Sequence, residues 1–188
     1  MKITFLGQAG LLFDLDGIMV MIDPYLSNSV EKVEPKNYRR QPIDESCFDV
    51  KPDILILTHN HLDHTDPETL EKLFSKHNGI CVLASGNAWQ TVRKFGGNNN
   101  YVMFNRGTVW TEKRIKFEAV HAEHSDDRAI GVIISYGGSN YYITGDTLYN
   151  KKVINDINLP IDAVFLPING AGNNMNITQL AQAIGIQA

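Results

Sequence analysis

The sequence has few cysteines, no excess of basic residues and no long apolar run, and each shortage excludes a class of protein. Among 188 residues there are two cysteines, Cys47 and Cys81, which stand far apart and form no C-x-x-C pair. Each is expected to be a small hydrophobe or a thiol rather than half of a disulfide or a metal ligand. The 21 acidic residues outnumber the 17 basic ones, which gives a net charge of −4. This balance provides no electrostatic footprint for nucleic acid or an anionic membrane, so neither is expected as a partner.

The N-terminus and the overall composition indicate an ordinary globular chain. Residues 1–7 lack the basic start, the apolar stretch and the cleavage site of a signal peptide. No apolar run approaches the length of a membrane span, so a cytoplasmic protein is expected. The acidic balance is compatible with an anionic small-molecule substrate, because the charge of a bound metal can outweigh a weak global field. The hydrophobic fraction is 43% and the charged fraction 20%, as in folded proteins. The length suits one domain, which we predict to span residues 1–188.

Strand and helix patterns alternate along the chain and predict an α/β fold. Short apolar or alternating stretches are typical of strands, and we predict strands at residues 3–6, 11–15, 18–22, 53–58, 80–84, 101–104, 109–111, 115–120, 130–136, 141–144 and 163–166. The last of these is predicted to be buried. Helices are predicted from Pro67, with Asp66 as its cap, to a stop before Gly79, and at residues 86–95, 147–157 and 177–184.

Residues 27–52 separate the first hairpin from the next strand and carry no regular pattern. The segment is polar, and prolines stand at positions 35, 42 and 52. A loop of this length is usually functional or disordered. Two interpretations are therefore equal: a lid over a site, or a solvated surface excursion. Tyr38, Arg39 and Arg40 are its only candidates for binding an anionic group.

The strongest chemical signal is the segment H-N-H-L-D-H (59–64), which follows an apolar strand and places four potential metal ligands in six residues. His59 and His61 are two residues apart at the end of an extended strand, so their rings leave on the same side. Asp63 and His64 fall where the chain turns toward the next helix and can approach the same cavity from elsewhere. We predict that this segment serves two adjacent metal ions, which lie about 3.5–4 Å apart in two-metal sites. Histidines on a surface loop are the weaker alternative.

Ligands from one segment rarely complete a metal site, and other strand ends offer further candidates. His121 and His124 follow one predicted strand, Asp146 follows another, and Asp23 follows the first hairpin. This layout fits a site on one edge of stacked sheets. Asp23 has two equal interpretations, a hydrogen-bonding support for the site or a turn residue before proline. Asp146 could also cap a helix that begins at Thr147.

Five short motifs resemble those of the metallo-β-lactamase superfamily: I-D-P (22–24), T-H-N-H-L-D-H-T-D-P (58–67), A-E-H-S (122–125), T-G-D-T (144–147) and L-P-I-N-G (166–170). The resemblance spans nearly the whole chain. The next segment, A-G-N-N-M-N (171–176), looks most similar to the branch that contains ascorbate 6-phosphate lactonase and related bacterial metal-dependent hydrolases. The resemblance implies a four-layer α/β/β/α sandwich and hydrolysis of a lactone or a phosphoester, such as a phosphorylated sugar derivative.

The resemblance also implies a role for each candidate ligand. Six residues match the family's ligands to a first metal, a second metal or both: His59, His61 and His124 for the first, Asp63 and His64 for the second, and Asp146 as the bridge. His121 is interpreted as a supporting residue or merely a strand-end histidine, and the latter is favoured. Asp63 and Asp146 would orient the attacking water and relay its proton. Imidazole and carboxylate ligands suit Zn²⁺, Mn²⁺ or Fe²⁺, and a metal pair can lower the pKa of bound water to about 7.

One departure from the family pattern concerns the C-terminus. The family places a further metal-ligating histidine on a strand after the last helix, whereas this sequence stops at I-Q-A (186–188). We therefore expect a fold that is incomplete at this end and a first metal that is bound more tightly than the second. We also expect an exposed sheet edge, which favours homo-oligomers or aggregation.

Three other functions are alternatives to that of a metal-dependent hydrolase. A nucleic-acid-processing member of the family is disfavoured by the acidic balance and by the lack of a basic, aromatic-laced stretch. A secreted β-lactamase is disfavoured by the lack of a signal peptide. A degenerate or truncated metal-binding protein with little catalytic activity is the main alternative, and the metal content per chain would test it.

Overall fold

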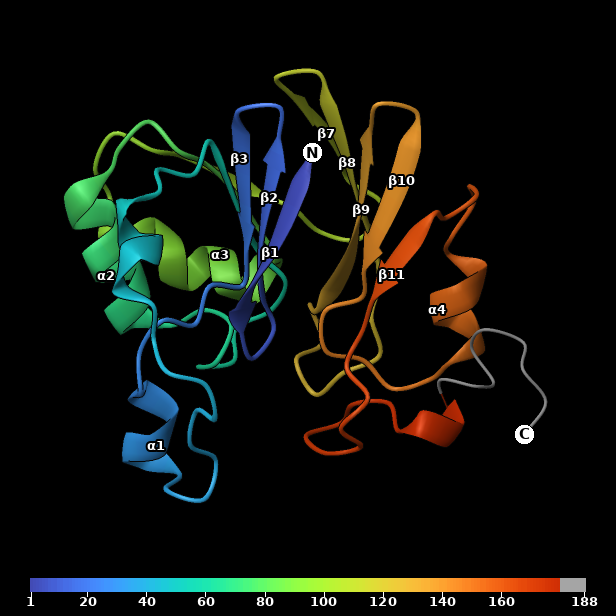
Figure 1. Ribbon diagram of the computed structural model, residues 1–188. Coiled ribbons are helices and arrows are strands. Elements are labelled where there is room, and N and C mark those ends of the chain that lie inside the picture. The colour runs from blue at the N-terminus through green and yellow to red at the C-terminus, as the bar shows by residue number, and fades with distance from the viewer. Residues whose placement is uncertain (180–188) are drawn as a thin grey trace. The chain divides into compact units, whose positions relative to one another are not determined.

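The computed structural model describes residues 1–179, which form two compact units. Unit 1 comprises Met1–Met103, and unit 2 begins at Phe104. Each unit contains one β-sheet and its own helices (Figure 1). The α/β class predicted from the sequence is therefore confirmed. Within the described part of the chain, no helix has the length and apolar character that crossing a membrane would require.

Unit 1 is built on a six-stranded sheet in which the strands follow one another in sequence order. The strands are β1 (Lys2–Gly7), β2 (Gly10–Leu15), β3 (Ile18–Ile22), β4 (Ile54–Leu57), β5 (Cys81–Ala84) and β6 (Asn100–Met103). The first three pair antiparallel, and the rest add in parallel. The predicted turn between β2 and β3 is confirmed, because Asp16 and Gly17 both have the positive φ angles that a type I′ hairpin turn needs.

The helices of unit 1 include the one predicted from Pro67, whose first N–H groups are satisfied by a side chain. They are α1 (Ser29–Val33), α2 (Pro67–Lys76) and α3 (Gly86–Val92), with short 3₁₀ turns η1 (Glu45–Asp49) and η2 (Arg93–Phe95). The predicted cap is confirmed, because the carboxylate of Asp66 accepts hydrogen bonds from the N–H groups of Glu68 and Thr69. Leu70 and Leu73 of α2 are fully buried and join the hydrophobic core that Leu55 and Leu57 of β4 also enter. This packing fixes the chain on both sides of the segment 59–64.

The segment 27–52 was predicted to carry no regular structure, but it contains α1 and η1. One buried arginine ties it to the rest of unit 1. The guanidinium of Arg39 donates hydrogen bonds to the backbone carbonyls of Leu6, Tyr25 and Gln41. Gly7 makes room for it, since a Cβ at that position would lie 2.2 Å from Arg39 Nη2. Desolvation lowers the pKa of Arg39. Three of the five N–H groups of Arg39 are thus used within the fold, which disfavours this residue as an anion-binding group.

Unit 2 contains a five-stranded sheet in the order β11-β10-β9-β8-β7. The strands are β7 (Val109–Glu112), β8 (Ile115–His121), β9 (Ile130–Tyr136), β10 (Ser139–Ile143) and β11 (Ala163–Phe165). All neighbours pair antiparallel except β10 and β11, which are parallel. The first five residues of β9 are buried, as expected for the central strand of a sheet.

Two predictions for unit 2 are wrong. The helix predicted at 147–157 is confined to α4 (Lys151–Asn155), because Thr147 is used in long-range bonds: its N–H donates to Asn174 and its hydroxyl accepts from the N–H of Glu123. The strand predicted as buried at 163–166 is the edge strand β11, in which Val164 is 43% exposed. The helix predicted at 177–184 begins where it was predicted, since residues 177–179 are helical, and its remainder lies outside the described residues.

Unit 2 also contains a partly open apolar pocket of about 250 Å³ beside α4, whose lining includes Tyr142, Val153 and Ile157. The phenolic hydroxyl of Tyr142 is buried and has no hydrogen-bond partner within residues 1–179. Desolvation raises the pKa of this hydroxyl far above its usual value. Tyr142 therefore stays protonated and contributes mainly apolar surface to the core.

Candidate metal centre

The histidine-rich segment of unit 1 begins where β4 ends. Strands β3 and β4 run parallel with Ile22 opposite Ile56, so both strands end at the same edge of the sheet. The residues that follow are brought together across 35 positions of sequence, because the N–H of Asp23 donates to the carbonyl of Ile56 at 2.9 Å and the N–H of Thr58 donates to the Asp23 carboxylate. The parallel register thus places a carboxylate directly behind the ligand segment.

The Asp23 carboxylate accepts three hydrogen bonds. Oδ1 accepts the N–H of Thr58 at 2.8 Å. Oδ2 accepts the hydroxyl of Thr58 at 2.5 Å and Nδ1 of His64 at 2.8 Å. Asp23 is 1% exposed and has a φ angle of +43°, a left-handed conformation that aspartate tolerates better than most residues. The interpretation of Asp23 as a hydrogen-bonding support is therefore confirmed, and it is more than a turn residue before proline.

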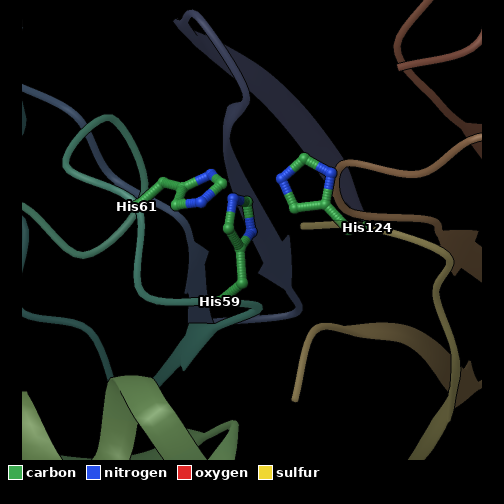
Figure 2. Close-up of side chains that lie close together, drawn as sticks. All are labelled: His59, His61 and His124. Carbon is green, nitrogen blue, oxygen red and sulfur yellow. The ribbon is translucent and has the colours of Figure 1, made fainter. Parts of the chain in front are cut away.

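Three side chains of unit 1 present ligand atoms within 4.8 Å of one another: Asp23, His59 and His64, all buried. The rings of His59 and His64 have centroids 3.9 Å apart, and those of His59 and His61 lie edge-on at 4.6 Å. In Figure 2 the imidazoles of His59 and His61 extend from the loop that follows β4. The fourth predicted ligand, Asp63, is 37% exposed and lies 3.9 Å from His64 Nε2. Unit 1 thus gathers all four predicted residues of the segment 59–64 at one place.

The donor set of unit 1 fits a divalent metal ion. It consists of imidazole nitrogens and carboxylate oxygens without thiolate, which suits Zn²⁺, Mn²⁺ or Fe²⁺. Two of the three imidazoles are buried beside a buried carboxylate, and such polar groups are costly to remove from water unless they are paired or bind a cation. The arrangement of His64, whose Nδ1 bonds Asp23 while Nε2 faces the other way, is the one that metal-ligating histidines usually adopt.

In unit 2, the loop of residues 171–176 contacts both predicted ligands. The side-chain amide of Asn174 donates to Asp146 Oδ2 at 2.9 Å, and the carbonyl of Asn173 lies 3.4 Å from Nδ1 of His124, which extends from the loop after β8 (Figure 2). Asn174 is 7% exposed, and its Oδ1 accepts the N–H of Thr147 at 3.1 Å. The sequence motif A-G-N-N-M-N served only as a mark of the family branch, so Asn174 was missed as a supporting residue.

The sequence left open the roles of His121 and Asp146. The contacts of His121 favour a strand-end histidine over a supporting residue. His121 is held by neighbours on the sheet edge: its N–H donates to Asp156 at 2.7 Å, and its Nε2 lies 3.3 Å from Glu123. A hydrogen bond from Arg106 lowers the pKa of Asp156, which keeps that carboxylate charged. Asp146 does not cap a helix, because the cap of α4 is Asn150.

Comparison with known families gives one match that covers almost the whole chain. A family described as the Beta-lactamase superfamily domain matches residues 2–186. Among curated proteins, a UPF0173 metal-dependent hydrolase from Flavobacterium johnsoniae is 31% identical, with 94% of this chain and 75% of the relative covered. A second, from Exiguobacterium sp., is 30% identical, with 89% and 73% covered. This chain therefore spans about three quarters of the length of these relatives.

Solved structures share the fold. A protein from Parabacteroides distasonis named as a metal-dependent hydrolase is 26% identical, with a TM-score of 0.75 over 98% of this chain and 76% of that one. Igni18, a metallo hydrolase from the archaeon Ignicoccus hospitalis, has a TM-score of 0.76 over 98% and 77% of the two chains. At 22% identity, the second likeness bears on the fold alone.

Proposed function

We propose, from the premise that this chain belongs to the β-lactamase superfamily and to its UPF0173 metal-dependent hydrolases, that it hydrolyses a small lactone or phosphoester. The observation that carries the proposal is the buried arrangement of Asp23, His59 and His64 at the ends of two parallel strands. Structural roles alone rarely require two buried imidazoles beside a buried carboxylate.

The proposed metal ligands come from both units. Unit 1 would contribute His59, His61, Asp63 and His64, and unit 2 would contribute His124 and the bridging carboxylate of Asp146. A divalent metal bound there would supply Lewis-acid chemistry, since it lowers the pKa of water to about 7 and polarises a carbonyl or phosphoryl oxygen. The native metal is proposed to be Zn²⁺, Mn²⁺ or Fe²⁺, because the donor set does not distinguish among them.

The two proposed catalytic carboxylates differ in how they are held. Asp63 is 37% exposed, and its nearest charged neighbour within the described chain is His64 at 3.9 Å, so it can turn toward substrate and water. Asp146 is half-buried, and Asn174 holds its Oδ2 at 2.9 Å. We therefore assign proton relay to Asp63 and orientation of the attacking water to Asp146. Asp23 takes no direct part, because its carboxylate already accepts three hydrogen bonds.

The proposed substrate class rests on the family branch and on the few cations available in unit 1. The segment 171–176 resembles the branch that contains ascorbate 6-phosphate lactonase, which favours a lactone or a phosphorylated sugar derivative. Arg39 is engaged with backbone carbonyls, whereas Arg40 and Tyr38 of the same loop are exposed. If the substrate carries a phosphate away from the reacting bond, Arg40 is the residue of this loop that we expect to contact it.

Metal analysis combined with a substrate screen tests the proposal. The purified chain would be analysed for zinc, manganese and iron, and then assayed with lactones and phosphoesters after loading with each metal. We expect bound metal and turnover of at least one substrate, both lost in His61→Ala. Metal binding without turnover of either class would contradict the proposed function and favour a metal-binding protein with little activity. Absence of metal binding would contradict the site itself.

A further inference from the structure

We propose that Thr58 is a positioning residue that fixes the tautomer of His59, so that one buried carboxylate orients two metal-binding histidines. This inference rests on the proposed function only in taking His59 and His64 as metal ligands. Asp23 reaches His64 directly, through Nδ1 at 2.8 Å. It reaches His59 through Thr58, whose hydroxyl oxygen lies 2.5 Å from Asp23 Oδ2 and 3.1 Å from His59 Nδ1.

The hydrogen bonds that lead from His59 through the Thr58 hydroxyl to Asp23, called the relay below, can run in one direction only. A threonine hydroxyl carries a single proton, and a carboxylate oxygen can only accept. At 2.5 Å from Asp23 Oδ2, the Thr58 hydroxyl must donate that proton to the carboxylate, because two oxygens without a proton between them would repel at this distance. The hydroxyl then has only lone pairs to offer His59, so Nδ1 of His59 must carry the hydrogen that it donates.

The same reasoning assigns the second nitrogen of each ring. A neutral imidazole has one N–H and one lone pair. With the hydrogen on Nδ1 in both His59 and His64, the lone pair of each ring lies on Nε2, and Nε2 is therefore the atom that would bind a metal. Without the Thr58 hydroxyl, Asp23 would still orient His64 directly, but it would lose its link to Nδ1 of His59.

The hydrogen bonds of the relay are shielded from water. Thr58 and His59 are fully buried, and Asp23 is 1% exposed, so water does not compete for these hydrogen bonds. The Thr58 N–H donates separately to Asp23 Oδ1 at 2.8 Å, which holds the backbone in place even when the side chain is changed. Removing only the hydroxyl should therefore release the ring of His59 while the strand end keeps its position.

The direct test is the tautomer of His59, read from ¹⁵N shifts and long-range ¹H–¹⁵N correlations of the histidine rings in the purified chain, with and without Zn²⁺. We expect the Nδ1–H form for both His59 and His64 in the wild type. Thr58→Val should lose the uniform Nδ1–H state of His59 while His64 retains it, and Thr58→Ser should restore it. An Nε2–H tautomer of His59 in the wild type would overturn the proposal even if the valine variant does not fold.

A matched control separates the relay from simple loss of a buried hydroxyl. Thr65 is also buried, but its hydroxyl donates to the backbone carbonyl of His59 at 2.7 Å. Thr65→Val should keep the His59 tautomer. In Zn²⁺ titration, Thr58→Val should bind about 10–100-fold more weakly than Thr58→Ser, as expected for loss of an outer partner of a ligand. Equal affinities of these two variants would contradict the relay. The tautomer result stands whether or not any substrate is hydrolysed.

Discussion

The two units hold their candidate ligands in different ways. Unit 1 supplies four candidates from six consecutive residues and supports them with a carboxylate that is buried behind the sheet edge. Unit 2 supplies His124 and Asp146, which are far apart in sequence, and each contacts an asparagine of the loop 171–176. In these contacts unit 1 uses strand ends and a buried carboxylate, and unit 2 uses the asparagines of a loop.

This difference predicts which unit holds its candidate ligands more rigidly. Hydrogen bonds to an ionised, buried carboxylate are shorter and stronger than those between neutral groups. In unit 1 the distances to Asp23 are 2.5–2.8 Å, whereas in unit 2 the contacts are 2.9 Å to Asp146 and 3.4 Å to His124. We therefore expect substitutions behind the site to have larger effects in unit 1 than in unit 2.

The largest effect is expected from His61→Ala, which removes a proposed ligand while leaving the Asp23 network intact. Loss of an outer partner usually lowers metal affinity about 10–100-fold, so loss of a ligand itself should lower it by more than about 100-fold. The free energy of unfolding of the metal-free chain should change little, since His61 is only half-buried. Competition titration with a chromogenic chelator measures the affinity, and a variant that binds metal as the wild type does would remove His61 from the site.

The next largest effect is expected from Asp23→Asn, which tests the charged support of unit 1. An amide cannot accept all three hydrogen bonds and places a donor where two donors already point, so we expect about 3 kcal/mol lower stability and about 10–100-fold weaker metal binding. Urea denaturation and metal titration measure the two quantities. Asp14→Asn, in β2 of the same sheet, where the carboxylate accepts only the N–H of Gly17 in the hairpin turn among the described residues, should stay within about 0.5 kcal/mol of the wild type. If both variants behave alike, the buried network has no special role.

A smaller effect is expected from Asn174→Ala, the equivalent test in unit 2. It removes the amide that holds Asp146, and we expect metal affinity to fall about 10-fold, the lower end of the range for such partners. Asp146→Asn, which alters the proposed bridging ligand itself, should lower metal affinity and hydrolysis together while the fold stays intact. The comparison between units fails if Asn174→Ala weakens metal binding more than Asp23→Asn does.

The smallest change in the free energy of unfolding is expected from removing single tyrosine hydroxyls. The sign of this change should differ between the two units. In unit 1 the hydroxyl of Tyr101 donates to the carbonyl of Gly96 at 2.7 Å, so Tyr101→Phe should destabilise the chain by about 0.5–1 kcal/mol. In unit 2 the buried hydroxyl of Tyr142 has no partner within the described residues, so Tyr142→Phe should be neutral or stabilise by up to about 1 kcal/mol. Thermal unfolding of the three proteins at pH 8 measures both changes.

The same tyrosine gives a pH dependence. Burial raises the pKa of Tyr142 above its ordinary value of 10.0, so the folded chain keeps its full stability, as far as this group is concerned, below about pH 10. Stability is lost as the pH rises further, because the unfolded chain ionises Tyr142 before the folded chain does. The stability advantage of Tyr142→Phe over the wild type should therefore grow between pH 9 and pH 11. A constant difference would show that Tyr142 titrates normally.

Short-range features of the chain were predictable from the sequence. The α/β class, the eleven strands and the cap of α2 follow from local patterns of apolar residues and from the chemistry of Asp66 and Pro67, which act within a few positions. The segment 59–64 was identifiable as a metal-binding candidate because four ligand types in six residues carry their own spacing. Such features depend on backbone geometry that neighbouring residues impose on one another.

Tertiary structure decided which distant residues support that segment. Asp23 meets Thr58 across 35 positions because β3 and β4 pair in parallel, and the register of that pairing is not encoded at either residue alone. Asn174 meets Asp146 across 28 positions, and Arg39 meets Leu6 across 33, through loops whose paths depend on the packed units. The helix predicted at 147–157 was shortened for the same reason, since Thr147 bonds distant partners in place of its helical neighbours. Residue types determined the chemistry available to this protein, and the pairing of strands and loops determined which groups face each other.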